Sequence, residues 1–462
     1  MTTTTAVVNP ATERVIAEVP IHGVEETDEA VARALAAGPA WRAVAPADRA
    51  RLMRRFAAQV EAHAEELAQL ETANVGKPIG ESRDEVGMVA EVLYFYAGAV
   101  DKHRGATVPV AGGVDMTFHE PLGVVGAIIP WNFPVAITSW KVGPALATGN
   151  TVVVKPAEIT PLTAVRLAEL GLEAGLPEGV LQVVTGRGSV VGTRLAEHPD
   201  VAKIAFTGST EVGREVMSRA SGTIKRVTLE LGGKSASVVF ADADLARAAA
   251  SAPGGVFANA GQDCCARSRI LVERTVLDEF LDLLADAVRA WTVGDPTDPA
   301  CRMGPLVTAA HRNVVASFLA EGMGAPGSPV PVHTAGAVPD GPGFWFPPTV
   351  VAPADPGWRM AREEIFGPVV AVIPFDDEEE AVRLANDTPY GLSGSIWTRD
   401  GARSLRMARA VQAGNLSVNS NSSVRVQTSF GGMKQSGFGR ELGLEALASY
   451  SEVKNVFVST VD

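Results

Sequence analysis

The sequence has little cysteine, no excess of positive charge and no long apolar run, and each shortage excludes a class of protein. Three cysteines in 462 residues cannot build a disulfide framework, and with a start that lacks a signal peptide they indicate the reducing cytoplasm. A net charge of −13 disfavours nucleic-acid and membrane-surface partners, because both need a basic field. Apolar runs such as 122–129 are too short to span a bilayer. No Cys/His cluster has metal-ligand spacing, so we expect no metal site.

Histidine is also scarce, since only seven occur and none lies in a carboxylate-flanked motif. Cys264 sits in a stretch of small residues, 257–267, that reads as a helix end or loop. A free thiol titrates near ~8.5, so a working cysteine needs a base or a positive environment. Glu230, in Thr-Leu-Glu-Leu-Gly-Gly-Lys-Ser at 228–235, is the available base. This pairing after a nucleotide-type sheet predicts oxidation of an aldehyde through a thioester, although Cys264 and Cys265 taken alone also suit two buried small hydrophobes.

The chain is too long for one core, and strand-like and helix-like segments alternate along most of it. Period-3.6 apolar spacing predicts helices at 26–38, 46–71 and 81–100. Strands then alternate with helices from 123 to 230 and from 234 to 425, which is typical of parallel, doubly wound sheets. Ligands of such sheets bind at the carboxyl ends of the strands. The predicted strands are 124–129, 151–155, 180–184, 202–206, 226–230, 236–240, 270–272, 369–373, 394–397 and 414–418, and the predicted helices are 135–147, 160–174, 188–197, 211–220, 244–258, 275–291, 305–322, 377–386 and 400–411.

Three segments fall outside this alternation. Two short runs around Gly112-Gly113, within 107–119, predict a hairpin that pairs with another element or subunit. Residues 449–460 alternate again and predict a terminal strand. The segment 325–349 is rich in Pro and Gly and is expected to be surface loop.

Two strand-end motifs suit a dinucleotide. The first, Phe-Thr-Gly-Ser-Thr-Glu-Val-Gly at 206–213, opens a helix whose backbone amides favour an anion, and Gly208 permits close approach. Alone, a plain helix-start turn explains this motif equally well. The second, Lys-Pro-Ala-Glu, ends in Glu158, which can accept both hydroxyls of an adenosine ribose and would repel a 2′-phosphate. This favours NAD over NADP, and a solvated Lys155–Glu158 pair is the alternative.

Two further motifs suit catalysis and the other half of the cofactor. In Pro-Trp-Asn-Phe-Pro at 130–134, Asn132 can donate to a developing oxyanion, or it can simply cap a rigid turn. In Glu-Glu-Ile-Phe-Gly-Pro at 363–368, Glu364 suits a second ribose and Phe366 suits a flat ring, and a polar turn with one anchoring Phe is the alternative. Six such motifs at strand ends of one chain are not expected by chance.

On these motifs the sequence resembles the NAD(P)-dependent aldehyde dehydrogenase superfamily, from about residue 9 to the C-terminal strand, with a seventh matching motif at 430–437. The resemblance implies that Cys264 is the nucleophile and that Asn132 and the Cys264 amide form the oxyanion hole. Glu230 would activate the thiol or the deacylating water. The remaining site residues that the resemblance implies are Lys141 for proton relay, then Trp131, Lys155, Glu158, Gly208, Ser209, Leu231, Glu364 and Phe366 for NAD, then Phe133, Trp140, Cys265 and Phe430 for the substrate pocket.

The resemblance also implies an α/β fold in three parts. These are a Rossmann-like NAD-binding domain (1–102 and 122–232), an α/β catalytic domain (233–430) and a small β oligomerisation arm (103–121 and 448–462). Arms of this kind pair between subunits, so a homodimer or homotetramer is expected. The implied reaction adds the thiolate to a small-molecule aldehyde, passes hydride to NAD and cleaves the thioester with water.

Two charged residues near the expected substrate tunnel predict opposite substrates. Asp263 precedes the nucleophile and would attract a cation, and 259–264 is similar to the γ-aminobutyraldehyde (1-pyrroline) dehydrogenase branch. Both favour an ω-amino-aldehyde such as 4-aminobutanal. Arg425 lies in a polar loop, 418–426, that replaces the aromatic-rich loop of many members, and it would bind a carboxylate instead. The alternatives are therefore a semialdehyde dehydrogenase or a broad-specificity aliphatic or aromatic aldehyde dehydrogenase.

Three other functions are disfavoured by residues that are present. A CoA-acylating enzyme of this family usually lacks a base at the position of Glu230. An inactive structural paralogue would be expected to lose Cys264 or Glu230, and both remain. A cofactor-free cysteine hydrolase would need a suitable histidine and would not need the nucleotide motifs.

Overall fold

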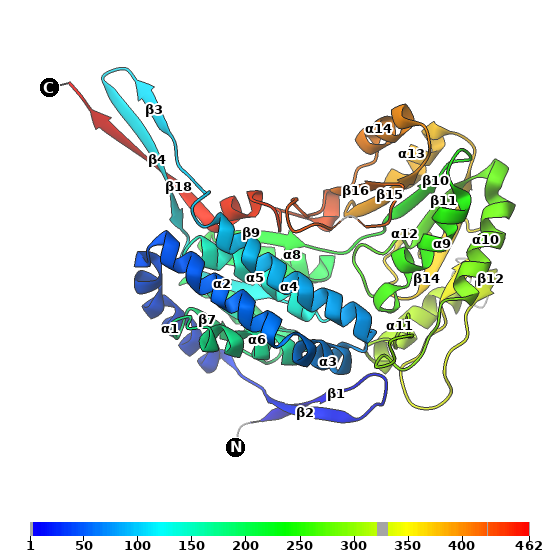
Figure 1. Ribbon diagram of the computed structural model, residues 1–462, viewed down its shortest axis with the longest axis horizontal. Helices are drawn as coiled ribbons and strands as arrows, with labels where there is room; N and C mark the ends of the chain where they lie inside the picture. Colours follow the sequence, from blue (N-terminus) through cyan, green and yellow to red (C-terminus); the bar gives the residue numbers. More distant parts are fainter. Residues whose placement is uncertain (1–2, 321–330, 423, 462) are drawn as a thin grey trace.

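Two helix-flanked sheets and a projecting β arm make up the protein, whose computed structural model describes residues 3–320, 331–422 and 424–461 (Figure 1). The first sheet has the strand order β17-β9-β8-β5-β6-β7. Its strands are parallel except β17, which pairs antiparallel with β9. Its adjacent strands β5 and β6 are buried along their whole length, as expected for a parallel sheet covered on both faces. The strand bounds are β5 (Val124–Ile128), β6 (Thr151–Lys155), β7 (Leu181–Val183), β8 (Val201–Thr207), β9 (Arg226–Glu230) and β17 (Gly437–Phe438).

Helices cover both faces of this sheet, and alternate residues of one strand face the two layers. Val125 and Ala127 of β5 pack in a core with α2, α4, α5 and α6, whereas Val124 and Ile128 pack with α1, α7 and α8. Every residue of α5 is buried, because α4 packs over it. The helix bounds are α1 (Val24–Ala43), α2 (Pro46–Ala62), α3 (Ala64–Val75), α4 (Ile79–Ala99), α5 (Pro134–Ala147), α6 (Leu162–Glu173), α7 (Thr193–Glu197) and α8 (Thr210–Ala220).

The second sheet has the order β12-β13-β14-β11-β10-β15-β16 and a core of its own. It is parallel except for the β12–β13 pair at one edge. Its strands are β10 (Ala236–Val239), β11 (Arg269–Glu273), β12 (Val332–Ala335), β13 (Thr349–Val351), β14 (Val369–Phe375), β15 (Ser393–Trp397) and β16 (Asn415–Val418). Its helices are α9 (Leu245–Val256), α10 (Leu277–Arg289), α11 (Ala309–Ala320), α12 (Arg359–Arg362), α13 (Glu378–Asn386) and α14 (Gly401–Ala410).

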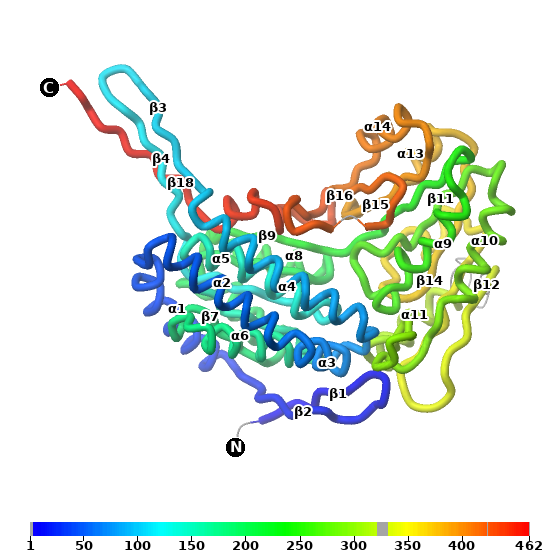
Figure 2. The backbone as a smooth tube through the Cα atoms, in the orientation of Figure 1, coloured from blue at the N-terminus to red at the C-terminus, as the bar shows by residue number. Residues whose placement is uncertain are grey.

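The arm is a three-stranded antiparallel sheet that leaves the body, as the tube in Figure 2 shows at the C-terminus. It joins β3 (Thr107–Val110), β4 (Gly113–Pro121) and β18 (Ser451–Ser459), and the last two pair along nine residues each. Strands of the arm keep apolar side chains exposed, among them Val108, Phe118, Val453 and Phe457. The arm therefore exposes apolar side chains together with the unpaired edges of β3 and β18.

The expected α/β class and most predicted elements are confirmed, and the differences have local causes. The predicted helix 46–71 is two helices that meet at His63, where the backbone leaves the helical region. The N-terminal hairpin of β1 (Thr4–Val8) and β2 (Val15–Pro20) was not expected. The predicted loop 325–349 contains the edge strand β12, while its first part lies outside the described residues. Within the described residues, no helix is long and apolar enough to cross a membrane.

Candidate active site

Cys264 follows a turn of left-handed backbone. Asn259, Ala260 and Gly261 have φ of 48°, 56° and 70°, a region that residues with side chains rarely adopt. Such conformations persist only where the surroundings hold them, and they gather at functional sites. Gly261 is required for a second reason, because a Cβ there would lie 2.2 Å from the carbonyl oxygen of Gly367. The turn leaves Asp263 and Cys264 partly exposed between the buried residues Gln262 and Cys265.

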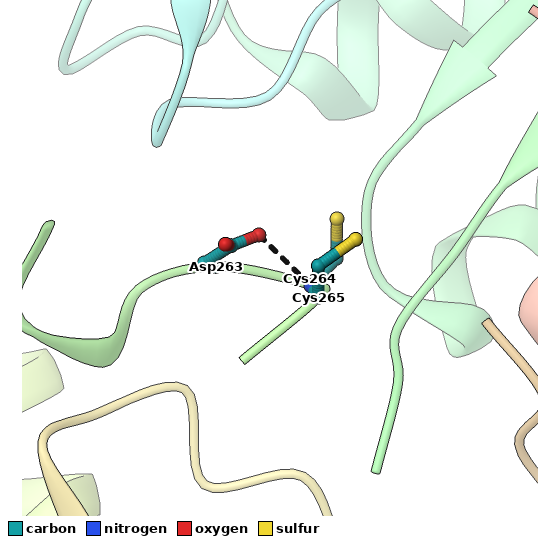
Figure 3. A group of neighbouring side chains, drawn as sticks. All are labelled: Asp263, Cys264 and Cys265. Atoms are coloured by element: carbon teal, nitrogen blue, oxygen red, sulfur yellow. Dashed lines mark hydrogen bonds between the residues drawn. The ribbon is translucent and has the colours of Figure 1, made fainter. Parts of the chain in front are cut away.

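Two thiols and a carboxylate lie together after this turn (Figure 3). The possible ligand atoms of Asp263, Cys264 and Cys265 are within 4.8 Å of one another, and the Cys265 N–H donates to Asp263 Oδ1 at 2.8 Å. We assign no metal to this group, because its central member is the expected nucleophile. Hydrogen bonding with Cys265 and burial raise the pKa of Cys264 well above its ordinary value. A raised pKa favours the thiol form of Cys264 over the thiolate.

Glu230 ends β9 as a buried carboxyl group without a donor. Its side chain is 4% exposed, and neither carboxylate oxygen has a hydrogen-bond partner among the described residues. Burial, followed by the negative charge of Glu441, raises the pKa of Glu230 well above its ordinary value. A buried acid without donors favours its neutral form, and once ionised it is a strong base.

A buried ion pair lies near Glu230, and the sequence analysis predicted only one of its two members, Lys141. Lys141 on α5 donates to Thr207 Oγ1 at 2.9 Å and pairs with Glu441. Glu441 itself was not predicted. Reciprocal backbone hydrogen bonds with Phe430, of 2.7 and 2.8 Å, hold it in place. Its signal in the sequence is a single acid shortly after the 430–437 motif, which pattern alone does not separate from a surface residue.

Asn132 precedes α5, whose first residue is Pro134. The side chain of Asn132 is buried, and its Nδ2 donates to the carbonyl oxygen of Gln262 at 2.9 Å. The amide has two N–H groups, so this bond leaves one donor for another acceptor. Because Gln262 lies two residues before Cys264, the bond places the Asn132 amide beside the nucleophile loop.

Two adjacent glycines bring three motifs into contact. A Cβ on Gly233 would lie 2.3 Å from the carbonyl oxygen of Cys264, and a Cβ on Gly232 would lie 2.1 Å from Glu364 Oε2. Glu364 Oε1 in turn accepts the Gly233 N–H at 2.9 Å. The Gly-Gly pair after Glu230 therefore lets the nucleophile loop and Glu364 approach the end of β9. Burial raises the pKa of Glu364 to about 7.

The predicted cofactor residues gather at one edge of the first sheet. Lys155 is the last residue of β6 and is buried, whereas Glu158 is exposed beyond it. The Ser209 hydroxyl caps α8 by accepting the Val212 N–H at 3.3 Å, which leaves its own proton free to donate. Gly208 precedes it, and a Cβ there would lie 2.5 Å from the Phe206 ring. A cation, an exposed carboxylate and a helix start at the carboxyl ends of parallel strands fit a dinucleotide.

Leu231 follows Glu230 and is buried under α8. Its N–H donates to the carbonyl oxygen of Ser436 at 3.0 Å, and its side chain packs against Gly213 of α8. The Leu231 side chain is thus part of the packing that holds α8 on the sheet.

Aromatic side chains from both sheets meet near the expected nicotinamide site. The rings of Trp131 and Phe366 pack edge to face at 5.2 Å, and Phe366 has a positive φ of 56°. His311, which the sequence did not single out, joins them at 5.3 Å from Trp131 and forms a 2.7 Å hydrogen bond with the Phe366 carbonyl oxygen. No local motif marks His311 in the sequence, because its two partners, Trp131 and Phe366, are distant from it along the chain.

The predicted pocket residues share one apolar cluster beside the thiol. Trp140 and Phe430 pack with ring centres 5.2 Å apart, and Cys265 is buried in the same cluster. Phe133 and Cys264 pack against it from partly exposed positions. The structure therefore brings the predicted apolar wall and nucleophile together.

The two charged candidates lie in different surroundings. Asp263 is partly buried next to Cys264, and burial raises its pKa. Arg425 is exposed, and its guanidinium donates to Ser422 Oγ at 2.7 Å and to the Val424 carbonyl oxygen at 2.6 Å. A carboxylate oxygen of Asp263 lies within 4.8 Å of the Cys264 sulfur.

Comparison with known proteins gives one consistent result. Residues 1–456 match the model of the aldehyde dehydrogenase family. The chain is 44% identical over 458 residues to the NADP/NAD-dependent aldehyde dehydrogenase PuuC of Escherichia coli strain K12, covering 98% of this chain and 92% of that protein. It is 40% identical over 464 residues to betaine aldehyde dehydrogenase of Bacillus subtilis strain 168, covering 98% and 94%.

Solved structures agree with the sequence comparison. PnpE from Pseudomonas sp. WBC-3, crystallised with nicotinamide adenine dinucleotide, superposes with a TM-score of 0.95 at 43% identity, covering 99% of this chain and 94% of that chain. At that identity and coverage, the similarity extends over the whole fold. The chain belongs to the aldehyde dehydrogenase family.

Proposed function

We propose that the aldehyde that this NAD-dependent aldehyde dehydrogenase oxidises carries an ω-amino group, as 4-aminobutanal does. The placement of Cys264, Asn132 and Glu230 around one loop supports the chemistry. Bound NAD would supply the hydride acceptor, with Lys155, Glu158 and Ser209 on its adenosine side and Glu364 and Phe366 on its nicotinamide side.

The residues of the chain divide the remaining work. The Cys264 thiol releases its proton to solvent, and the resulting thiolate adds to the aldehyde carbon. The remaining N–H of the Asn132 amide stabilises the oxygen anion that forms. After oxidation the carbon is a thioester on Cys264. Glu230 then takes a proton from water, the hydroxide adds to the thioester, and the carbon–sulfur bond breaks to release carboxylate and thiolate.

The single observation that supports an amino-aldehyde is the position of Asp263. Its carboxyl group lies partly buried beside the nucleophile, where its Oδ1 accepts the Cys265 N–H, whereas Arg425 is exposed and donates to Ser422 and Val424 of its own loop. An ammonium group next to Asp263 would favour the ionised carboxylate and offset its burial. A semialdehyde carboxylate at the same place would instead be repelled.

Asp263→Asn tests this assignment directly. We expect the variant to lose kcat/KM for 4-aminobutanal by about tenfold while hexanal oxidation changes little, because only the first substrate carries charge. Asp282→Asn, an exposed acid on α10, is the matched control. Equal losses for both aldehydes would reject the amino-aldehyde, and a gain specific to succinic semialdehyde would show that Asp263 merely repels anions.

We also propose a homodimer or homotetramer in the cytoplasm, assembled through the arm. The exposed apolar side chains of β3, β4 and β18 and the unpaired edges of that sheet support an interface there. Three free cysteines are consistent with a reducing compartment. Removal of 451–462 should yield a monomer by light scattering, and an unchanged mass would place the interface elsewhere.

A further inference from the structure

A carboxyl group on α4 reaches the left-handed turn before the nucleophile. Glu81 lies in the first turn of α4, and its Oε2 accepts the backbone N–H of Asn259, 178 residues later, at 3.0 Å. This carboxyl group takes no part in the proposed chemistry. It is nevertheless partly buried, where an acid is costly to keep unless it holds something in place.

Asn259 links that turn to the oxyanion amide. Its Nδ2 donates to the backbone oxygen of Asn132 at 2.9 Å and to the carbonyl oxygen of Gln262 at 3.3 Å. The Asn132 Nδ2 donates to the same Gln262 oxygen at 2.9 Å. Since one N–H of the planar amide is fixed by that bond, the direction of the other N–H is fixed as well. The turn therefore determines where Asn132 aims.

The Gln262 side chain is a second anchor of the turn. The Gln262 side chain donates to the Asn259 carbonyl oxygen at 2.9 Å and accepts the Val307 N–H at 2.8 Å. Asn259 and Ala260 both have positive φ although neither is glycine. A conformation of this kind relaxes when an anchor is lost, because the chain has more favourable backbone regions available.

We propose that Glu81 is a positioning residue, which holds the Asn259 N–H and so aims the Asn132 amide at the oxyanion formed on Cys264. The proposal rests on the cysteine chemistry proposed above, and it requires no particular aldehyde. It gives α4 a role in catalysis although no α4 side chain is assigned to the reacting atoms.

The charges around Glu81 make the same hydrogen bond sensitive to pH. Burial raises the pKa of Glu81 to about 7, the Lys77 ammonium opposes this, and Asp263 and Asp84 add to it. A carboxylate is a stronger acceptor than a carboxylic acid. The grip on Asn259 should therefore weaken as the pH falls through about 7.

Two reactions of the purified full-length protein distinguish the orientation of the Asn132 amide from the accessibility of the Cys264 sulfur. Transfer of the acetyl group of p-nitrophenyl acetate to the Cys264 sulfur breaks the ester carbon–oxygen bond, releases p-nitrophenolate and passes through an oxyanion. Alkylation of the same sulfur by iodoacetamide displaces iodide without an oxyanion. Neither reaction needs NAD or an aldehyde. Their rate ratio reports the oxyanion hole alone.

Glu81→Ala should slow acetyl transfer at least about tenfold while iodoacetamide alkylation changes less than about threefold, because only the oxyanion loses its donor. Glu81→Gln should recover most of the acetyl-transfer rate, since its amide oxygen also accepts an N–H. Glu91→Gln, an exposed residue of the same helix, is the matched control.

Parallel losses in both reactions, or no loss in either, would overturn the positioning role. Asn132→Ala separates this failure from a failure of the proposed function. If Asn132→Ala slows acetyl transfer and Glu81→Ala does not, only the role of Glu81 is wrong. If Asn132→Ala leaves acetyl transfer unchanged, the oxyanion hole itself is wrong and the role of Glu81 is rejected with it.

Discussion

Lys141 and Glu441, 300 residues apart in the sequence, form a buried ion pair behind Glu230. Both side chains are almost fully buried, and the negative charge of Glu441 contributes to the raised pKa of Glu230. The charges of Glu441 and of Lys141 on α5 therefore act in opposite directions on the pKa of Glu230. The position of this pair makes the protonation of Glu230 depend on a residue that touches neither substrate nor thiol.

Glu441→Gln should lower the pKa of Glu230 and reduce the stability of the fold. The variant removes an anion near Glu230 and leaves the Lys141 cation unpaired, so the ionised form of Glu230 becomes easier to reach. Its pKa should fall, and the rise of kcat with pH should move to lower pH. Breaking a buried pair from one side costs about 3–5 kcal/mol. Thermal unfolding measures the loss, and an unchanged pH profile would contradict the coupling.

Cys264 should react slowly at neutral pH in the protein without cofactor. Hydrogen bonding with Cys265 and burial raise its pKa, so the thiolate fraction is small near pH 7 and grows as the pH rises. The rate of iodoacetamide alkylation should accordingly increase through and beyond the ordinary range of a thiol. Cys265→Ala should move this rise to lower pH. A plateau already reached below neutral pH would show a pre-formed thiolate instead.

Glu230→Gln should stop the reaction at the thioester. The amide cannot take a proton from water, so oxidation on Cys264 can proceed once but the product remains attached. Rapid mixing should show a burst of NADH equal to the enzyme concentration, and mass spectrometry should find the acyl group on Cys264. Absence of both the burst and steady turnover would mean that Glu230 is needed earlier, to ionise the thiol.

Glu158→Ala should relax the cofactor preference. Glu158 is exposed just past the end of β6, where its carboxylate would accept ribose hydroxyls and repel a 2′-phosphate. We expect the ratio of kcat/KM for NAD over NADP to fall by about tenfold, mostly through weaker NAD binding. A ratio that does not change would place the ribose away from this residue.

The sequence allowed prediction of both sheets, and local motifs at strand ends supplied the candidate site residues that the structure brings together. Glu441, Glu81 and His311 were missed for a common reason. Each contacts a partner that is distant in the sequence, such as Lys141 for Glu441 and Asn259 for Glu81. Local sequence patterns do not indicate contacts between residues so far apart.

The other misses are also physical. The break at His63 divides a continuous apolar pattern without a proline or glycine to announce it. The N-terminal hairpin gains its pairing from tertiary contact rather than from a strong alternating pattern. The opposite substrate charges predicted from Asp263 and from Arg425 could be weighed only with the structure. The sequence does not show that Asp263 is partly buried and that Arg425 is exposed.

We propose that an aldehyde bound to Cys264 is oxidised to a thioester while NAD is reduced. The most direct test follows NADH absorbance with 4-aminobutanal, succinic semialdehyde, hexanal and benzaldehyde, each with NAD and with NADP, in the wild type and in Cys264→Ala. We expect NAD reduction that is fastest with 4-aminobutanal and absent in the variant. Cofactor binding without turnover of any of the four aldehydes, or turnover that survives in Cys264→Ala, would contradict the account.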